Sequence, residues 1–592
     1  MDSKIDKNNE YIFNSPNYVH IMIEYLGKVT GDKKNEEGVF ITFINNEYAI
    51  ASIKLDILRE NNKVDESNQD INYIRGIITT YINSSDFRII YVVPTQLYTL
   101  QEISAIEAAQ VNLLESNPQL NLNGEGVIIG IIDTGIDYLN EEFRDNNGKS
   151  RILYIWDQTI NSDSNNNYQV PFGTLYTNEQ INKAIEVYNS GGNPYDIVPS
   201  KDNYGHGTGM AGIVGAIGKN KDIKGIAPAC KFVIVKLSEA KYTQKSLGVN
   251  TPIFSLTSIF PVIEYFRKVL FNEKKPIVIL LPLGTNNGNH KGNNIFDNFL
   301  ENISSNVGVV IVTGAGNQGN VDGHVSGTIR DKDTIEVIEM LIADNQKYMA
   351  LEMWVDLPDI VEVNLISPSG EETGFIQAGA NVDKLSNFIF EKTIAKISYF
   401  IPEAYTGEEK VSIYFSNLVP GIWQLKLRIR EGEMAKYNAW LWQSGLALPG
   451  TRLTPSNPYG TLTVPGDSDF VVTVAAYNQN NNNLVSYSGV SFRNEYIDKI
   501  DIAAGGANTL TVGLNNSTQV ISGTSLAAAI GAGACVLLFQ WGIVQGNYPY
   551  MYSQSIKTFL RRGVIKRGKD NYPNPQWGYG IINFYKIFEK ML

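Results

Sequence analysis

Residues 127–137 read VIIGIIDTGID, a run of aliphatic residues that ends at Asp133 and a Thr-Gly turn. Such a run is typical of a buried parallel strand with polar residues at its carboxyl end. Similar segments follow at Cys230–Leu237, Pro276–Leu283 and Val307–Thr313, with helix-like segments between them. This alternation predicts an α/β fold with a doubly wound, mostly parallel sheet. Ligands of such sheets bind at the carboxyl ends of the strands, where Asp133 is expected.

The first hundred residues have a different pattern. Strand-like segments at Gly38–Ile50 and Phe87–Pro94 are mixed with amphipathic, helix-like segments, and none of the motifs described below occurs there. We therefore expect a separate α+β domain over residues 1–101, followed by a helix-like run at Ile103–Leu114.

The pattern changes again between residues 326 and 454. Segments rich in β-branched and aromatic residues, such as GIWQLKLRIRE at 421–431, are spaced by turn residues. This spacing predicts an all-β sandwich inserted into the α/β domain. The α/β domain is therefore expected in two parts, 102–325 and 455–592.

The composition limits the classes of partner, the cellular compartment and the kind of scaffold that can be expected. The 592 residues include 49 basic and 61 acidic side chains, and the net charge of -12 disfavours nucleic acid and anionic membranes. Only two cysteines, Cys230 and Cys535, are present, far apart and in apolar contexts, which excludes a disulfide scaffold. The polar N-terminus lacks the apolar segment of a signal peptide, so synthesis in the cytoplasm is expected. The longest apolar stretch, SLAAAIGAGACVLLFQW at 525–541, predicts a buried helix and no membrane span.

Three motifs follow one another in the order Asp, His, Ser. Asp133 ends the first strand, His206 lies in NYGHGTGMAGIVGA (203–216), and Ser525 lies in ISGTSLAAAIGAGA (521–534). A serine hydroxyl is a weak nucleophile unless an imidazole accepts its proton. A buried carboxylate must in turn hold the imidazole in the right tautomer. The three motifs therefore predict a catalytic triad.

A fourth motif, VVIVTGAGNQGN at 309–320, places Asn317 after a strand and between glycines. Its side-chain amide is a candidate donor to the oxyanion that forms during acyl transfer. Each motif alone has an ordinary structural interpretation, since Asp-Thr-Gly forms turns, Ser and Thr cap helices, and Asn adopts left-handed conformations. Their joint occurrence, each in the required secondary structure, favours the catalytic interpretation.

These motifs, together with GIAPACKFVIVKL (225–237) and DIAAGG (501–506), resemble the signature of the subtilases, the subtilisin-like serine proteases of peptidase family S8. More narrowly, the chain resembles the Csp germination proteases of spore-forming anaerobic bacteria. The long N-terminal region, the sandwich insertion and the cytoplasmic-type start support this resemblance. It implies a subtilisin-like fold with a jelly-roll-like insertion and an N-terminal prodomain.

The resemblance also implies how the parts work. Residues 1–101 would be an intramolecular chaperone and inhibitor that the enzyme removes itself and can retain after cleavage. Cleavage is expected near Pro94–Gln101, with Gln96 or Gln101 as candidate sites, although an ordinary interdomain linker is the alternative. The mature protease would be packaged in the spore and would cleave the zymogen of a cortex-lytic hydrolase.

An extended peptide substrate is expected to pair with two strand edges, which would also form the pocket for the residue before the scissile bond. The candidate residues are Leu283, Gly284, Gly314, Ala315 and Gly316. We predict no metal and no cofactor, since the chain lacks an Asp-rich loop of the EF-hand type. His20, His290 and His324 are expected to be incidental. Carbohydrate binding is one interpretation of Trp354, Trp423, Trp440 and Trp442, but core packing is expected for most of them.

Two departures from the family pattern leave alternatives open. Pro282 stands before Leu283-Gly284 where subtilases usually have Ser, and proline removes a backbone donor. Ala504-Gly505-Gly506 replaces the usual Ala-Pro-Gly. One alternative is therefore a pseudoprotease that senses germinants and whose active site is blocked by its prodomain or by Pro282. Another is a general intracellular degradative subtilase, which the large insertion disfavours.

Overall fold

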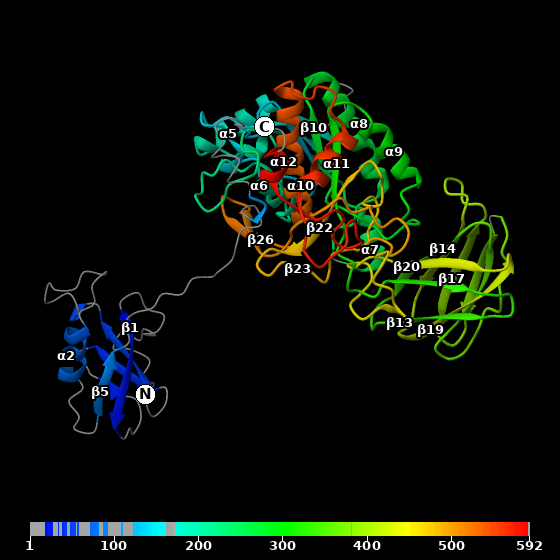
Figure 1. The fold of residues 1–592 in the computed structure, drawn as a ribbon, viewed down its shortest axis with the longest axis horizontal. Helices are drawn as coiled ribbons and strands as arrows, with labels where there is room; N and C mark the ends of the chain where they lie inside the picture. Colours follow the sequence, from blue (N-terminus) through cyan, green and yellow to red (C-terminus); the bar gives the residue numbers. More distant parts are fainter. Residues whose placement is uncertain are drawn as a thin grey trace. The chain divides into compact units, whose positions relative to one another are not determined.

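The computed structural model forms two compact units, Met1–Glu102 and Ile103–Leu592, and each is described here by itself (Figure 1). The predicted cleavage candidates Gln96 and Gln101, and most of the predicted helix at Ile103–Leu114, lie outside the described residues. The residues that the structure describes are 18–27, 33–34, 38–43, 48–54, 56–57, 71–81, 87–92, 108–110, 122–160, 170, 172–249, 251–380 and 382–589.

The N-terminal unit contains an antiparallel sheet and a helix. The strands lie in the order β2-β3-β4-β1-β5. Ile23, Val39, Ile53 and Ile78 are fully buried in this unit. The segment predicted as one strand at Gly38–Ile50 is instead parts of two paired strands. The bounds are β1 (Tyr18–Gly27), β2 (Lys33–Lys34), β3 (Val39–Phe43), β4 (Tyr48–Lys54), α2 (Ile71–Tyr81) and β5 (Phe87–Val92).

The second unit is built on an eleven-stranded sheet in the order β27-β28-β24-β22-β11-β10-β6-β9-β7-β8, with β23 paired to β22. The seven strands from β24 to β7 are parallel, which confirms the predicted α/β class with a mostly parallel sheet. Their bounds are β6 (Ile128–Asp133), β7 (Ile152–Asp157), β8 (Thr174–Thr177), β9 (Lys231–Lys236), β10 (Ile277–Leu280), β11 (Val309–Gly314), β22 (Val472–Asn478), β23 (Asn483–Leu484), β24 (Ile502–Gly505), β27 (Val564–Ile565) and β28 (Ile581–Ile582).

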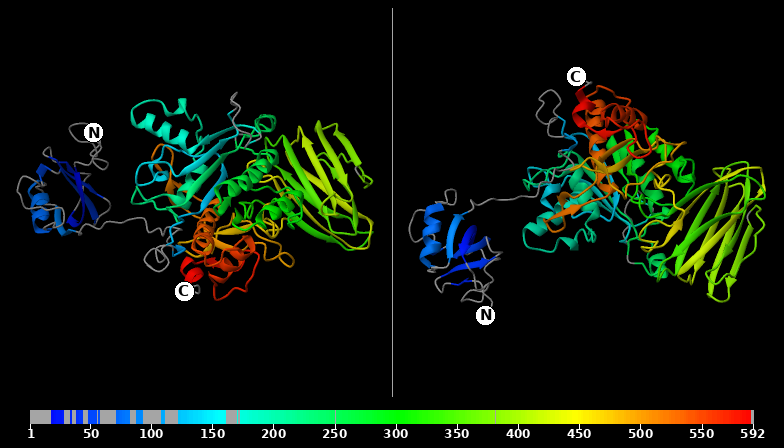
Figure 2. Two further views of the ribbon diagram at one scale, coloured as in Figure 1. Left: turned by 90° about the horizontal axis from the view of Figure 1, so that it is seen from above. Right: turned by 60° about the horizontal axis from the view of Figure 1, so that its bottom comes forward.

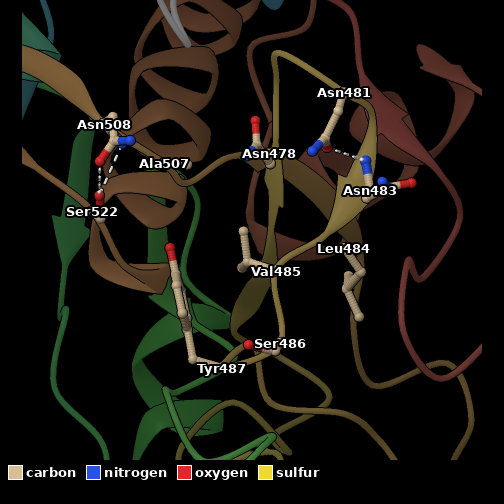
Figure 3. Close-up of a pocket in the computed structure, with 10 residues that line it drawn as sticks. All are labelled: Asn478, Asn481, Asn483, Leu484, Val485, Ser486, Tyr487, Ala507, Asn508 and Ser522. Atoms are coloured by element: carbon tan, nitrogen blue, oxygen red, sulfur yellow. Dashed lines mark hydrogen bonds between the residues drawn. The ribbon is translucent and has the colours of Figure 1, made fainter.

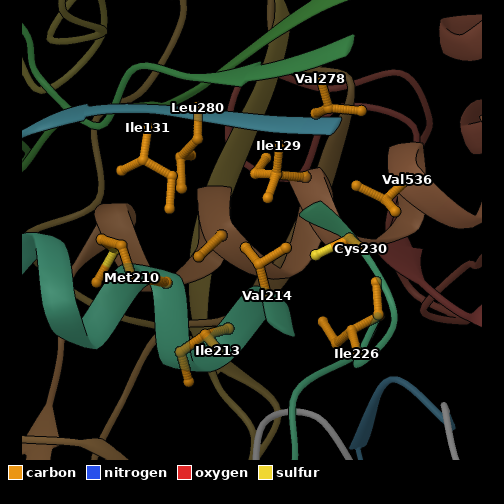
Figure 4. Close-up of a cluster of buried hydrophobic side chains, with 14 of the residues drawn as sticks. Ile129, Ile131, Met210, Ile213, Val214, Ile226, Cys230, Val278, Leu280 and Val536 are labelled. Atoms are coloured by element: carbon orange, nitrogen blue, oxygen red, sulfur yellow. The ribbon is translucent and has the colours of Figure 1, made fainter. Parts of the chain in front are cut away.

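Two separate apolar cores cover the faces of this sheet because side chains alternate along each strand. Ile129 and Ile131 of β6 join one core with Met210 (Figure 4), whereas Ile128 joins the other core with Phe266. Asp133 is in step with Ile129 and Ile131, so it belongs to the first face. That face is covered by α6 (His206–Gly215) and α10 (Thr524–Phe539), and the second by α8 (Leu256–Glu273) and α9 (Ile295–Ser304).

The small residues of α10 allow it to lie directly on the sheet. A Cβ on Gly531 would come within 2.7 Å of Val474, and one on Gly533 within 2.8 Å of Ile226. Among the described residues, Thr524–Val544 is the one helical stretch long and apolar enough to cross a membrane, and 83% of its apolar 18-residue window is buried inside the protein. The remaining elements around the sheet are α5 (Asn178–Asn189), α7 (Lys241–Leu247), β25 (Thr509–Val512), β26 (Thr518–Ile521), α11 (Ser553–Arg562) and α12 (Phe584–Glu589).

The insertion consists of two antiparallel sheets around one apolar core (Figure 2). One sheet has the order β12-β20-β14-β18-β17-β16 and the other β15-β19-β13-β21. The segment predicted at 421–431 is strand β19. The bounds are β12 (His324–Ile329), β13 (Glu336–Ile342), β14 (Tyr348–Val355), β15 (Ile360–Ile366), β16 (Val382–Phe388), β17 (Thr393–Phe400), β18 (Glu409–Ser416), β19 (Gly421–Glu431), β20 (Ala435–Leu441) and β21 (Arg452–Thr454).

Candidate active site

Asp133 and His206 are joined at the carboxyl edge of the parallel sheet. The carboxylate of Asp133 is fully buried at the end of β6. The Nδ1 atom of His206, the first residue of α6, lies 2.9 Å from its Oδ1 and 2.8 Å from its Oδ2. Oδ1 also accepts the backbone N–H of Thr134 at 2.7 Å. The carboxylate therefore fixes the imidazole with Nδ1–H as donor and leaves Nε2 as the free nitrogen.

The negative charge of Asp133 raises the pKa of His206 above its ordinary value of 6.5. Burial of the ring opposes this effect, whereas the hydrogen bond to Asp133 and the charge of Asp202 add to it. The site therefore stabilises the imidazolium that forms when His206 accepts a proton.

A second buried carboxylate, Asp202, holds the loop that carries His206 and was not among the predicted site residues. Its Oδ1 accepts the Thr134 hydroxyl at 2.9 Å and the backbone N–H groups of Tyr204 and Gly205 at 3.0 and 2.9 Å. Its Oδ2 accepts the N–H and hydroxyl of Thr208 at 3.0 and 2.8 Å. Asp202 thus ties both flanks of His206 to the residue after Asp133. An Asp followed closely by glycine ahead of the histidine was the available signal.

Ser525 reaches the same edge from α10, of which it is the second residue. Its Oγ donates to the carbonyl of Pro282 at 3.4 Å, and within the described chain no hydrogen bond joins it to His206. Pro282 follows β10, which pairs with β6 so that Leu280 lies opposite Ile131. Ser525 is therefore bonded to the chain that runs beside Asp133. The structure brings all three predicted triad residues to one edge but makes only the Asp-His link.

Asn317 lies beside the start of α10. Its Oδ1 accepts the backbone N–H and the hydroxyl of Thr524, both at 3.1 Å. Because the oxygen is used in this way, the Nδ2 group is left to donate elsewhere, and it has no hydrogen-bond partner among the described residues. This orientation suits an oxyanion donor.

The predicted substrate-binding segments differ in what their backbones offer. Ala315 donates its N–H to Val474 and accepts from Thr463, while Gly316 donates to the Thr524 hydroxyl and accepts from Gly489. These groups are used inside the protein, so Ala315 and Gly316 can form a wall of the pocket but cannot pair with a peptide.

Leu283 and Gly284 have no backbone hydrogen bond within the described residues and remain the candidate edge for peptide pairing. Thr463 packs between this edge and the wall formed by Ala315 and Gly316. A Cβ on Gly284 or Gly316 would lie 2.4 or 2.3 Å from the Thr463 hydroxyl oxygen. Gly314 packs equally closely on α10, where a Cβ would lie 2.6 Å from the carbonyl oxygen of Thr524.

A polar pocket of about 320 Å³ lies next to the serine motif (Figure 3). Tyr487 lines it and donates its hydroxyl to the Gly506 carbonyl at 2.6 Å, and Ser522 donates to Asn508 at 3.1 Å. Asparagine side chains make up much of the remaining lining. Within the described residues, no three His, Cys, Asp or Glu side chains form a group that would hold a metal ion.

Comparison with known proteins places this geometry in a family. The family model described as "Subtilase family" matches residues 124–346 and 455–580. The PIII-type proteinase of Lactococcus lactis subsp. cremoris (strain SK11) is 23% identical over 525 residues, which cover 81% of this chain and 25% of that protein. The PII-type proteinase of Lacticaseibacillus paracasei is 23% identical over 522 residues, with 81% and 26% covered. The chain thus spans about a quarter of the length of these curated relatives.

A solved structure matches over nearly its whole length. The Clostridium perfringens CspB protease superimposes with a TM-score of 0.73 at 29% identity, covering 82% of this chain and 98% of that one. This match confirms the resemblance to Csp proteases that the sequence indicated. The chain belongs to the subtilase family of serine-type endopeptidases.

Proposed function

We propose that the chain hydrolyses peptide bonds with Asp133, His206 and Ser525 as a catalytic triad. The observation that carries this proposal is the contact of both Asp133 carboxylate oxygens with His206 Nδ1, at 2.9 and 2.8 Å. It leaves Nε2 as the base, at the sheet edge that Ser525 also reaches.

The reaction then follows from the positions of the groups. Ser525 Oγ attacks the scissile carbonyl while His206 Nε2 takes its proton, and the imidazolium later protonates the leaving amine. Asn317 Nδ2 and the N-terminus of α10 stabilise the oxyanion. A water molecule, activated by the same imidazole, hydrolyses the acyl-enzyme. The substrate lies along Leu283–Gly284 as an added strand.

One rearrangement is required before attack. The Ser525 hydroxyl donates to the Pro282 carbonyl at 3.4 Å, a long and therefore weak hydrogen bond. Rotation about χ1 of Ser525 between staggered positions would redirect the hydroxyl toward His206. The low cost of leaving such a bond supports a competent nucleophile.

The contact between Ser525 and Pro282 also allows a second candidate function. If this contact persists when a peptide is present, the chain is a pseudoprotease that binds and signals without cleaving. Pro282 occupies the position at the edge where subtilases usually have serine, so this alternative rests on a departure from the usual family pattern.

The biological role that we propose follows the likeness to CspB. Residues 1–101 act as a prodomain that the protease cleaves near Gln96 or Gln101 and can retain. The mature protein, made in the cytoplasm and packaged in the spore, cleaves the zymogen of a cortex-lytic hydrolase during germination. The match over 98% of the CspB chain supports this role.

Self-processing tests the proposal. Wild-type protein is expected to release a fragment of about 100 residues, the size of the N-terminal unit, whereas Ser525→Ala remains intact. Ser522→Ala is the matched control, since its hydroxyl lies in the same motif but bonds to Asn508. Identical full-length migration of wild type and Ser525→Ala would favour the pseudoprotease. Sequencing the N-termini formed in a candidate cortex-lytic zymogen would then test the substrate.

A further inference from the structure

Two histidine rings stack on one tryptophan ring where the inserted β-sandwich meets the sheet domain. The ring centroids of His290 and Trp440 are 4.2 Å apart with an interplanar angle of 13°, and those of His324 and Trp440 are 4.7 Å apart at 19°. All three side chains are buried. Trp440 lies on β20 and His324 on β12, whereas His290 lies in the loop that follows Leu283–Gly284. The sequence analysis treated both histidines as incidental, and the structure places them at one junction.

The hydrogen bonds of His290 tie two segments of the chain together. Its Nδ1 lies 2.5 Å from the carbonyl oxygen of Leu462, and its Nε2 lies 3.1 Å from the carbonyl oxygen of Asn286. A ring nitrogen that carries a proton donates to the carbonyl that it faces. The imidazole thus bridges residues 286 and 462 while it stacks on Trp440.

Titratable groups surround the stacked rings. Burial and the neighbouring His290 lower the pKa of His324 to about 4. Burial also raises the pKa of Asp467, which accepts the Gly292 N–H at 2.9 Å, and Lys499 and Asp297 lie around that carboxyl group.

The two hydrogen bonds of His290 end beside the two walls of the candidate substrate pocket, which are Leu283–Gly284 and Gly314–Gly316. Asn286 is two residues beyond Gly284, and Thr285 between them exchanges two 3.0 Å backbone hydrogen bonds with Val464. Leu462 precedes Thr463, whose N–H donates to Ala315 at 3.1 Å. His290 therefore fixes the segments that hold the walls at their spacing.

The sandwich also contacts both segments that His290 bridges. Trp440 Nε1 donates to the carbonyl of Gly460, just before Leu462, at 2.8 Å, and Asn286 Nδ2 donates to the Leu441 carbonyl at 3.0 Å. Lys291 pairs with Asp356 at 2.6 Å and also with Glu408. These contacts restrict the movement of the loop that carries His290 and Lys291.

We propose that His290 is a positioning residue for peptide binding: by stacking on Trp440 and bridging Leu462 and Asn286 it sets the spacing of the pocket walls from the sandwich side. The proposal rests on the proposed peptidase function and adds the residue that couples the insertion to the substrate. His290 contacts none of the triad residues, so its loss should weaken substrate binding more than it slows the chemical step.

The kinetic test compares two histidines that stack on the same tryptophan ring. His290→Gln removes the ring that bridges Leu462 and Asn286, so KM for a peptide is expected to rise about tenfold while kcat changes less than about threefold. His324→Gln is equally buried, but its bonds reach Asn457 and Asn438, so KM should change less than about twofold. Labelling of Ser525 by a small fluorophosphonate should be unchanged in both. An unchanged KM in His290→Gln, or equal changes in both variants, would overturn the proposal.

A second variant keeps the test decisive. If His290→Gln does not fold, Trp440→Phe keeps an aromatic face beside His290 and is expected to raise KM by about threefold, and an unchanged KM there also overturns the proposal. Lack of fluorophosphonate labelling in wild type would instead refute the peptidase function.

Discussion

His206 and His290 are both held by hydrogen bonds to oxygen, but their surroundings differ in charge and access. The side chain of His206 is 38% exposed and faces a carboxylate, whereas His290 is 1% exposed and faces two backbone carbonyls. A partly open ring can exchange protons with a substrate, and its carboxylate stabilises the charge that results. A buried ring whose two nitrogens both face backbone carbonyls is out of reach of a substrate and can only hold its neighbours together. The chain thus uses one residue type for chemistry in one region and for positioning in the other.

The largest effect is expected when the charge beside His206 is removed. Asp133→Asn keeps the shape of the side chain but gives His206 a neutral partner, so kcat for a peptide should fall by about 10³–10⁴-fold. Asp145→Asn is the matched control, since that carboxylate only caps the surface turn at Asn147 and Lys149. A loss below tenfold for Asp133→Asn would remove the distinction between the two histidine sites.

A smaller effect is expected when the hydrogen bonds that hold the His206 loop are disturbed. Asp202→Asn replaces an acceptor of five hydrogen bonds by a group that also donates, so the His206 loop should shift. We expect kcat to fall about 10- to 100-fold, because small misplacements of a catalytic group cost rate steeply. KM should stay within about threefold, in contrast to His290→Gln. Equal losses of kcat in Asp202→Asn and His290→Gln would show that both sites act in the same way.

The spacing of the pocket walls can be tested by adding one methyl group. In Gly284→Ala the new Cβ would lie 2.4 Å from the Thr463 hydroxyl oxygen, so the free energy of unfolding should fall by about 1–3 kcal/mol. Gly568→Ala is the control, because no atom lies within 4 Å of its Cβ position. Its effect should stay within about 0.5 kcal/mol in denaturant titrations. Equal stability of the two variants would contradict the close packing at this wall.

The smallest effect is expected in the pH dependence of kcat/KM. Only neutral His206 can act as a base, so kcat/KM should fall as the pH drops through its pKa, which Asp133 raises above 6.5. The midpoint should move to lower pH in Asp133→Asn. Because this pKa is higher in the folded chain, the charged ring stabilises the fold below pH 6.5, and that contribution is lost as the pH rises through the raised pKa. An acid limb that does not move in Asp133→Asn would contradict the role of the carboxylate.

The elements that the sequence predicts well have local signals. Strand β6 is a continuous aliphatic run, β19 alternates regularly, and each triad residue lies in a short motif of its own. Strand β1, YVHIMIEYLG, was not predicted although its Tyr, Val and Ile residues are typical of strands. Asp202 lies only four residues before His206 and just ahead of a glycine, so its signal was local as well.

The junction around His290 could not be predicted in the same way. The hydrogen bond from His290 to Leu462 joins residues 172 positions apart, and Trp440 comes from a different sheet. No pattern along the chain connects these segments, because they meet only after the insertion has docked. The contact of Ser525 with Pro282 spans 243 positions and was missed for the same reason.

The rate at which a fluorophosphonate labels Ser525 tests the central claim most directly, since it needs an activated hydroxyl but no particular peptide. Wild-type protein should be labelled at Ser525 alone, and His206→Gln should react at least about 10³-fold more slowly. Equal rates in the two proteins, or labelling of neither after removal of the N-terminal unit, would mean that the imidazole does not activate the serine.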